Sequence, residues 1–169
     1  MHAALLLLSA LPSAFALHAY SVPNSLAIAE ADTNNSCVLP NDYQIKGYSA
    51  ESNSDGTLSA FSFTFEDDTV KVTTPCEFNS SSVSVRGNPT PRYQCDNNDI
   101  EFIWEDAKQY LTMAESVCPG TDGVDKYEVA GSTRIWLECP ESGGACTTNS
   151  TDYRSAFVSL NPVMNPSRI

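Results

Sequence analysis

The sequence predicts an all-β domain, a compact antiparallel β-barrel or sandwich stapled by disulfides. Apolar and polar residues alternate in at least seven short segments, and clusters of Gly, Pro, Asn and Asp separate these segments. Six cysteines follow an apolar N-terminal segment, and an even cysteine count in a secreted chain indicates a disulfide framework. With 169 residues, 41% of them hydrophobic, the chain is long enough to bury one core.

The N-terminal segment has the features of a secretory signal peptide. Residues 1–16 contain an apolar run from Ala3 to Leu11 and end in Ala14-Phe15-Ala16, a small-x-small cleavage pattern. An uncleaved membrane anchor is the lesser alternative, because this run is shorter than the ~20 residues that a spanning helix needs. We therefore expect a secreted, extracellular protein.

The rest of the chain divides into three parts. Residues 17–36 are small and polar without a clear period, which predicts a flexible leader. Residues 37–161 form the predicted disulfide-stapled β domain, and residues 162–169 form a C-terminal tail.

The clearest predicted strand covers residues 61–65, where three phenylalanines lie on one face and Ser62 and Thr64 on the other. Residues 53–56 before it and 66–68 after it are the expected turns. Residues 104–115 combine helix-forming residues with alternation, and we prefer a strand there. The remaining predicted strands are 43–45, 70–73, 82–85, 100–104, 133–137 and 156–160.

The cysteines are expected to form disulfides and no metal site. They are Cys37, Cys76, Cys95, Cys118, Cys139 and Cys146. No Cys-x-x-Cys pair occurs and no histidine follows His18, so the spacing argues against zinc. Six cysteines allow 15 pairings, and the spacing alone selects none of them. Three Asn-x-Ser/Thr sequons, at Asn34, Asn79 and Asn149, predict N-glycosylation on a eukaryotic secretory route.

The charge limits the classes of partner. Nine Lys and Arg stand against 21 Asp and Glu, which gives a net charge of -12. So few cations cannot form the basic footprint that a phosphate backbone or an anionic membrane surface requires, so we expect neither partner. The acidic surface instead favours basic partners through electrostatic steering.

Catalytic signatures are scarce in this sequence. The near absence of histidine argues against Ser-His and Cys-His catalysis, and no cofactor-binding motif occurs, so we expect a non-enzyme without a cofactor. A glycoside hydrolase needs only paired carboxylates, and Glu101, Glu105 and Asp106 near Trp104 are candidates. In so acidic a chain, solvated carboxylates are the preferred interpretation. Residues 96–99 predict a tight turn, since they lack the Gly and the distal Glu of a calcium loop.

Arg134 and Trp136 are candidate partner-binding residues. They are two positions apart on a predicted strand, so they share one face, and an exposed pair of this kind can anchor a partner. An ordinary core or rim position for Trp136 is the preferred interpretation.

Several cysteine-anchored segments resemble the Alternaria alternata major-allergen family of secreted fungal proteins. An early cysteine precedes an aromatic first strand, and a later cysteine follows an aromatic and a polar residue. The segments are 37–45, 61–63, Cys76, 92–95, 100–102, Cys139, Cys146 and 152–160.

The resemblance implies a compact antiparallel β-barrel in which Cys76 bonds Cys95 and Cys139 bonds Cys146. It also implies a homodimer linked through the early cysteine, here Cys37. Cys118 departs from the family pattern and offers Cys37 an intrachain partner instead.

These observations lead to one preferred function and two alternatives. We expect a non-enzymatic, allergen-like fungal effector or elicitor that binds an extracellular protein of a plant host. The first alternative is a carrier for a small apolar ligand, flavonoid-like or lipid-like, in a pocket between strands. The second is the carboxylate-dependent glycoside hydrolase.

Overall fold

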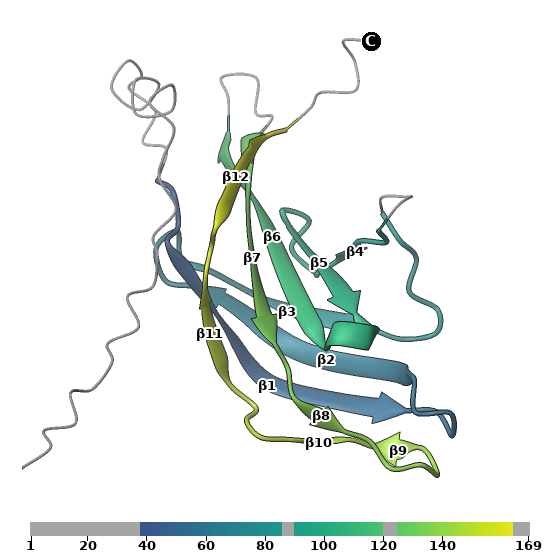
Figure 1. The fold of residues 1–169 in the computed structure, drawn as a ribbon. Coiled ribbons are helices and arrows are strands. Elements are labelled where there is room, and N and C mark those ends of the chain that lie inside the picture. The colour runs from purple at the N-terminus through teal and green to yellow at the C-terminus, as the bar shows by residue number, and fades with distance from the viewer. Residues whose placement is uncertain (1–37, 86–89, 120–124, 164–169) are drawn as a thin grey trace, which may run out of the picture.

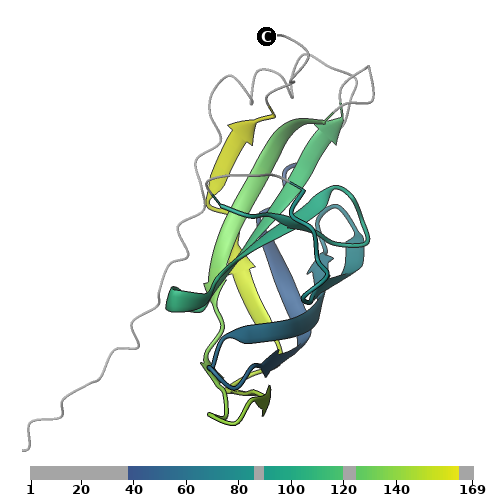
Figure 2. The same cartoon turned by 90° about the vertical axis from the view of Figure 1, so that its right-hand side faces the viewer.

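The computed structural model describes residues 38–85, 90–119 and 125–163, and the side chains of residues 119, 125 and 126 are not described. Two antiparallel sheets pack against each other (Figures 1 and 2). The first sheet has the order β11-β1-β2-β3, with β9 paired to the far end of β1, and the second has the order β12-β7-β6-β5-β4. The ladders of the described residues do not close into a ring, so the fold is an all-β sandwich.

The elements of the first sheet are β1 (Asp42–Ser52), β2 (Leu58–Asp67), β3 (Val72–Phe78), β9 (Gly144–Ala145) and β11 (Tyr153–Ala156). Those of the second are β4 (Tyr93–Gln94), β5 (Ile100–Glu105), β6 (Tyr110–Pro119), β7 (Asp125–Arg134) and β12 (Ser159–Pro162). A short 3-10 helix, η1 (Asp106–Lys108), joins β5 to β6, and β8 (Leu137–Glu138) pairs with β10 (Thr147–Thr148).

Aromatic rings fill much of the space between the sheets. Because side chains alternate along a strand, Phe61, Phe63 and Phe65 of β2 all point inward and are buried. Phe102 of the opposite sheet lies edge-on to the rings of Phe61 and Phe63, at centroid distances of 5.6 Å in both pairs. Such pairs add about 0.5 to 1.5 kcal/mol each to the burial of their apolar area.

At one side of the sandwich, a single stretch of chain passes from one sheet to the other. Strand β11 pairs with β1, and β12, which begins three residues later, pairs with β7 (Figure 2). Phe157 lies between them and is fully buried. Gly131 of β7 is needed at this crossing, because a Cβ atom there would lie 2.2 Å from the carbonyl oxygen of Ala156.

At the opposite side, a disulfide joins the two sheets. Cys76 of β3 bonds Cys95, which directly follows β4. The backbone N–H of Asp96 donates to the carbonyl of Pro75 at 3.0 Å, and that of Asn97 donates to the hydroxyl of Thr74 at 2.9 Å. The two sheets are therefore joined by a disulfide at this edge and by the continuous segment from β11 to β12 at the other.

The structure confirms the all-β class and the strands predicted at 61–65 and 100–104. The strand preferred for 104–115 is only partly right: β6 includes residues 110–115, but the 3-10 helix η1 interrupts the segment at 106–108. The prediction of a strand at 82–85 is wrong: Val83 is 81% exposed, and the Val85 N–H bonds the carbonyl of Arg92 in a loop. The strand predicted at 70–73 begins later, at Val72, because Val70 and Lys71 belong to a turn.

Two other predicted strands are interrupted. The strand expected at 133–137 ends at Arg134, and β8 starts at Leu137. The strand expected at 156–160 is divided at Phe157 and Val158, where the chain changes sheets. The predicted signal peptide and leader lie outside the described residues. None of the helices in the described part of the chain is long and apolar enough to cross a membrane.

Candidate functional site

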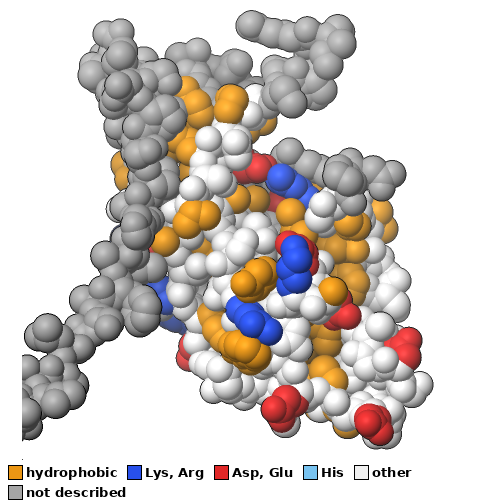
Figure 3. Space-filling model, viewed as in Figure 1, with side chains coloured by type: hydrophobic (Ala, Val, Ile, Leu, Met, Phe, Trp, Pro, Cys, Tyr) orange, Lys and Arg blue, Asp and Glu red, His pale blue; other side chains and the backbone are white. Residues whose placement is uncertain are grey.

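Three exposed side chains form a patch at the end of the second sheet, which we call the Arg–Trp patch: Tyr110, Arg134 and Trp136. The guanidinium carbon of Arg134 lies 3.5 Å from the centre of the Trp136 ring, a cation–π contact. Trp136 is 50% exposed and Tyr110 is 38% exposed, and Tyr110 faces Arg134 across the β6–β7 ladder. Cationic side chains lie beside hydrophobic ones on the face shown in Figure 3.

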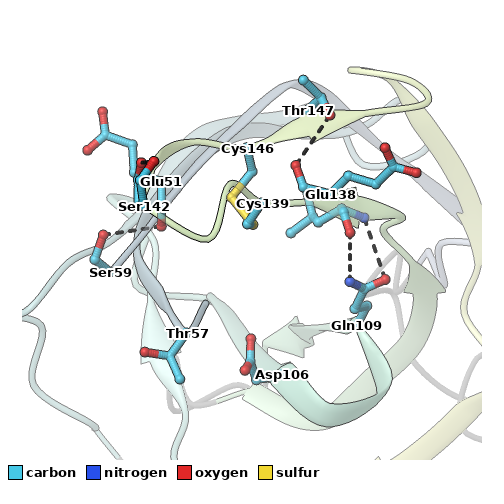
Figure 4. Close-up of a disulfide and its surroundings, with 12 residues drawn as sticks. Glu51, Thr57, Ser59, Asp106, Gln109, Glu138, Cys139, Ser142, Cys146 and Thr147 are labelled. Carbon is cyan, nitrogen blue, oxygen red and sulfur yellow. Dashed lines mark hydrogen bonds between the residues drawn. A yellow bond between two sulfur atoms is a disulfide. The ribbon is translucent and has the colours of Figure 1, made fainter. Parts of the chain in front are cut away.

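The backbone around Gln109 explains why Trp136 points outward. Ile135 is fully buried, and its N–H donates to the carbonyl of Gln109 at 2.9 Å. The amide of Gln109 donates to the carbonyl of Leu137 at 3.0 Å and accepts from its N–H at 3.5 Å (Figure 4). With both neighbours held in this way, Trp136 is fixed on the exposed side. The two candidate residues therefore meet by stacking beyond the end of β7, and not by sharing a face of one strand.

The charge around the patch leaves Arg134 open to a partner. Lys108 is paired with Glu105 at 2.8 Å. No Asp or Glu of the described residues lies within ion-pair distance of Arg134. The edge of its guanidinium is thus available for a bidentate contact with a carboxylate.

The carboxylates considered for sugar hydrolysis do not face one another across a cleft. Glu101 pairs with Arg92 at 3.3 Å, and Glu105 pairs with Lys108. The indole N–H of Trp104 donates to Asp106 at 3.1 Å. Glu101 and Glu105 are four residues apart on β5, so both lie on the same outer face of the sheet. This arrangement gives no support to the glycoside hydrolase alternative.

A buried carboxyl pair was missed by the sequence analysis. Asp67 of β2 and Glu115 of β6 are 1% and 2% exposed and meet between the two sheets. Burial, followed by the nearby charge of Asp67, raises the pKa of Glu115 to about 9. Asp67 accepts the backbone N–H groups of Thr69 and Val70. The turn predicted at 66–68 is wrong at Asp67, which is the last residue of β2. Alternation is the signal for the pair, since Asp67 is in phase with the inward phenylalanines.

A groove of about 500 Å³ crosses the outer face of the first sheet. Its lining includes Ser49 and Glu51 of β1, Ser62 of β2, and Glu77 of β3. The hydroxyls of Ser49 and Ser62 are 3.0 Å apart. The groove is open, and its lining mixes these polar groups with apolar side chains, among them Ala60 and Phe78. The carrier alternative, which expects an apolar pocket between strands, stays a prediction.

The structure contains the two disulfides that the resemblance implies, Cys76–Cys95 and Cys139–Cys146. The second closes a loop beside Glu51 and Ser59 (Figure 4). Cys118 is also disulfide-bonded, and Cys37 lies outside the described residues. The Cys37-linked homodimer therefore stays a prediction.

The remaining predicted sites are only partly within the described residues. Asn79 and Asn149 are exposed, as N-glycosylation requires, and Asn34 lies outside the described residues. Residues 96–99 form a turn in which Asn97 accepts the Asp99 N–H at 3.0 Å. In the described part of the chain, no group of three or more His, Cys, Asp or Glu side chains is placed to hold a metal ion.

Comparisons with known proteins identify the fold. No family model and no curated protein matches the sequence. A crystal structure of the Alternaria alternata allergen Alt a 1 superimposes with a TM-score of 0.51 at 10% identity, covering 78% of this chain and 95% of the allergen. A second crystal structure, of the Alternaria alternata major allergen Alt a 1, gives a TM-score of 0.49 at 9% identity, over 73% and 95% of the two chains. The resemblance drawn from the sequence is therefore confirmed at the level of the fold: this chain has an Alt a 1-like fold.

Proposed function

We propose that this chain is a secreted, non-enzymatic fungal effector or elicitor that binds an extracellular protein of a plant host through the Arg–Trp patch. The observation that carries the proposal is the exposed stacking of Arg134 on Trp136. Trp, Tyr and Arg are the residue types enriched at energetically dominant positions of protein interfaces. An Alt a 1-like fold, the N-terminal signal features and the disulfides support an extracellular site of action.

The patch is suited to a protein partner because its side chains are held in place before binding. Gln109 fixes the backbone on both sides of Trp136, and Arg134 covers one face of its ring. Less side-chain entropy is then lost on association, which leaves more of the contact energy for affinity.

The charges of this chain predict two properties of the partner, one at long distance and one at contact. Over long distances the net charge of -12 steers a basic protein toward the surface. At contact, the guanidinium of Arg134 takes a carboxylate of that protein. We therefore expect capture to weaken as the salt concentration rises above physiological ionic strength.

The test is capture from plant apoplastic fluid, with the bound proteins identified by mass spectrometry. The oxidised protein should retain a discrete basic protein, and the double variant Arg134→Ala/Trp136→Ala should lose it. The matched control is Val158→Ala, which trims an exposed apolar side chain elsewhere. Equal capture by the double variant, or by a reduced and alkylated chain, would contradict the proposal.

A further inference from the structure

Two of the predicted glycosylation sequons border the same groove on the first sheet. Asn79, which begins the sequon Asn79-Ser80-Ser81, is part of the groove lining, and so is Thr151, which completes the sequon Asn149-Ser150-Thr151. Thr151 is held along β1, because the Tyr48 N–H donates to its carbonyl at 2.9 Å. These sequons are separated by 70 positions in the chain, and the strand order alone brings them together.

The side chain of Asn79 is held in one orientation in the folded chain. The hydroxyl of Ser81 donates to Oδ1 of Asn79 at 2.5 Å, and the Ser81 N–H donates to the same atom at 2.9 Å. Both bonds are made by Oδ1, so Nδ2, the atom that carries an N-linked sugar, points away from Ser81. Transfer forms the bond from Nδ2 to the anomeric carbon of a lipid-pyrophosphate-linked oligosaccharide, breaks the anomeric C–O bond, and releases the lipid pyrophosphate and an amide proton.

The groove combines hydroxyls and carboxylates with apolar side chains such as Ala60 and Phe78, a mixture that suits the hydroxyls and the C–H faces of a sugar. The hydroxyls of Ser49 and Ser62 both donate and accept, and the carboxylates of Glu51 and Glu77 accept from sugar hydroxyls. Two carboxylates in the lining disfavour an anionic occupant, whereas a neutral sugar suffers no such repulsion. A volume of about 500 Å³ is within the range of small-molecule sites.

We infer that the first sugars of an N-linked glycan on Asn79 lie in this groove and cover the outer face of the first sheet. Because the glycan is attached to Asn79 at the groove wall, its effective concentration in the groove is high, and no free sugar has to be bound from solution. The inference rests on the proposed secretion, since N-linked sugars are added on the secretory route. It leaves the second sheet, with the Arg–Trp patch, as the face open to partners.

The test measures how fast an endoglycosidase removes the Asn79 glycan from protein secreted by a eukaryotic host. Release from the folded protein should be at least tenfold slower than from the reduced, denatured chain. Ala60→Trp fills the groove and keeps the sequon, so it should bring release from the folded protein close to the denatured rate. The matched control Thr73→Trp, on an exposed position of the same sheet, should leave release slow.

A second measurement covers the case in which Ala60→Trp fails to fold. Nuclear Overhauser contacts between the first N-acetyl methyl group and the methyl of Ala60 are expected in the glycosylated wild-type protein. Rapid release of the glycan from the folded wild-type protein, without these contacts, would overturn the inference. If the glycan is released rapidly from the wild type and Asn79→Gln binds added chitobiose, the groove takes free sugars and not the attached glycan, which would also overturn it. A secreted chain with no sugar on Asn79 would also overturn it, yet would leave capture through the Arg–Trp patch unchanged.

Discussion

The outer faces of the two sheets are made from similar alternating strands, yet they present different chemistry. The first sheet exposes a groove that is lined by hydroxyls, carboxylates and apolar side chains and is bordered by two sequons. The second sheet ends in a stacked Arg and Trp with no described carboxylate paired to the Arg. Aromatic and Arg side chains are enriched where proteins bind proteins, whereas Ser and Glu are depleted there. This difference is the basis of the two proposals: partner binding through the second sheet and sugar contact on the first.

Removing the disulfide that joins the two sheets should have the largest effect, because it lowers the unfolding free energy of the whole sandwich and so affects both outer faces together. For Cys76→Ala/Cys95→Ala we expect a loss of about 3 kcal/mol and a fall in melting temperature of roughly 10 °C, because a loop of 19 positions is no longer closed. Cys139→Ala/Cys146→Ala opens a loop of only 7 positions and should cost roughly 2 kcal/mol. Calorimetry on both variants checks the order, and a smaller loss for the first pair would be evidence against it.

The buried carboxyl pair should control stability without changing either face. With a folded pKa near 9 and an ordinary value of 4.5, Glu115 favours folding fully below pH 4.5, and this contribution is lost as the pH rises toward 9. We expect Glu115→Gln, which cannot ionise, to raise the melting temperature at pH 8 by at least about 4 °C and to change it little at pH 4.

The control for that experiment is Glu141→Gln, which removes one exposed carboxylate. It shares the general reduction in negative charge and should move the melting temperature by less than about 1 °C at either pH. The same shift in both variants would mean that net charge, and not the Asp67–Glu115 pair, governs the pH dependence.

A conservative change at the patch should have the smallest effect and would separate stacking from charge. Arg134→Lys keeps the cation but loses the planar group over Trp136, so we expect partner affinity to fall about two- to fivefold, the value of an exposed cation–π contact. Isothermal titration with the captured partner provides the measurement. Unchanged affinity would show that only the charge of Arg134 matters.

Alternation predicted the parts of the fold in which a strand pairs along its whole length. In β2 the three inward phenylalanines marked both the strand and its buried face. The same pattern at 82–85 failed, because period-two alternation does not show whether a neighbouring strand exists, and Val83 is left exposed.

The exposure and the stacking of Arg134 and Trp136 could not be predicted from the sequence. Alternation placed Arg134 and Trp136 on one face of a strand, for which an ordinary core or rim position was the preferred interpretation. Their stacking depends on the end of β7 and on hydrogen bonds from Gln109, which lies 27 positions before Trp136. The groove could not be predicted, because it arises only when three strands and the segment around Thr151 are side by side.

The most direct test of partner binding through the second sheet is the dissociation constant of the captured host protein for three forms: wild type, Trp136→Ala and Val158→Ala. Both positions are exposed and apolar, at 50% and 62%, so the control matches the change in surface. We expect Trp136→Ala to weaken binding about 30-fold, equivalent to about 2 kcal/mol, and Val158→Ala to leave it unchanged. Equal affinities for all three forms would contradict the account.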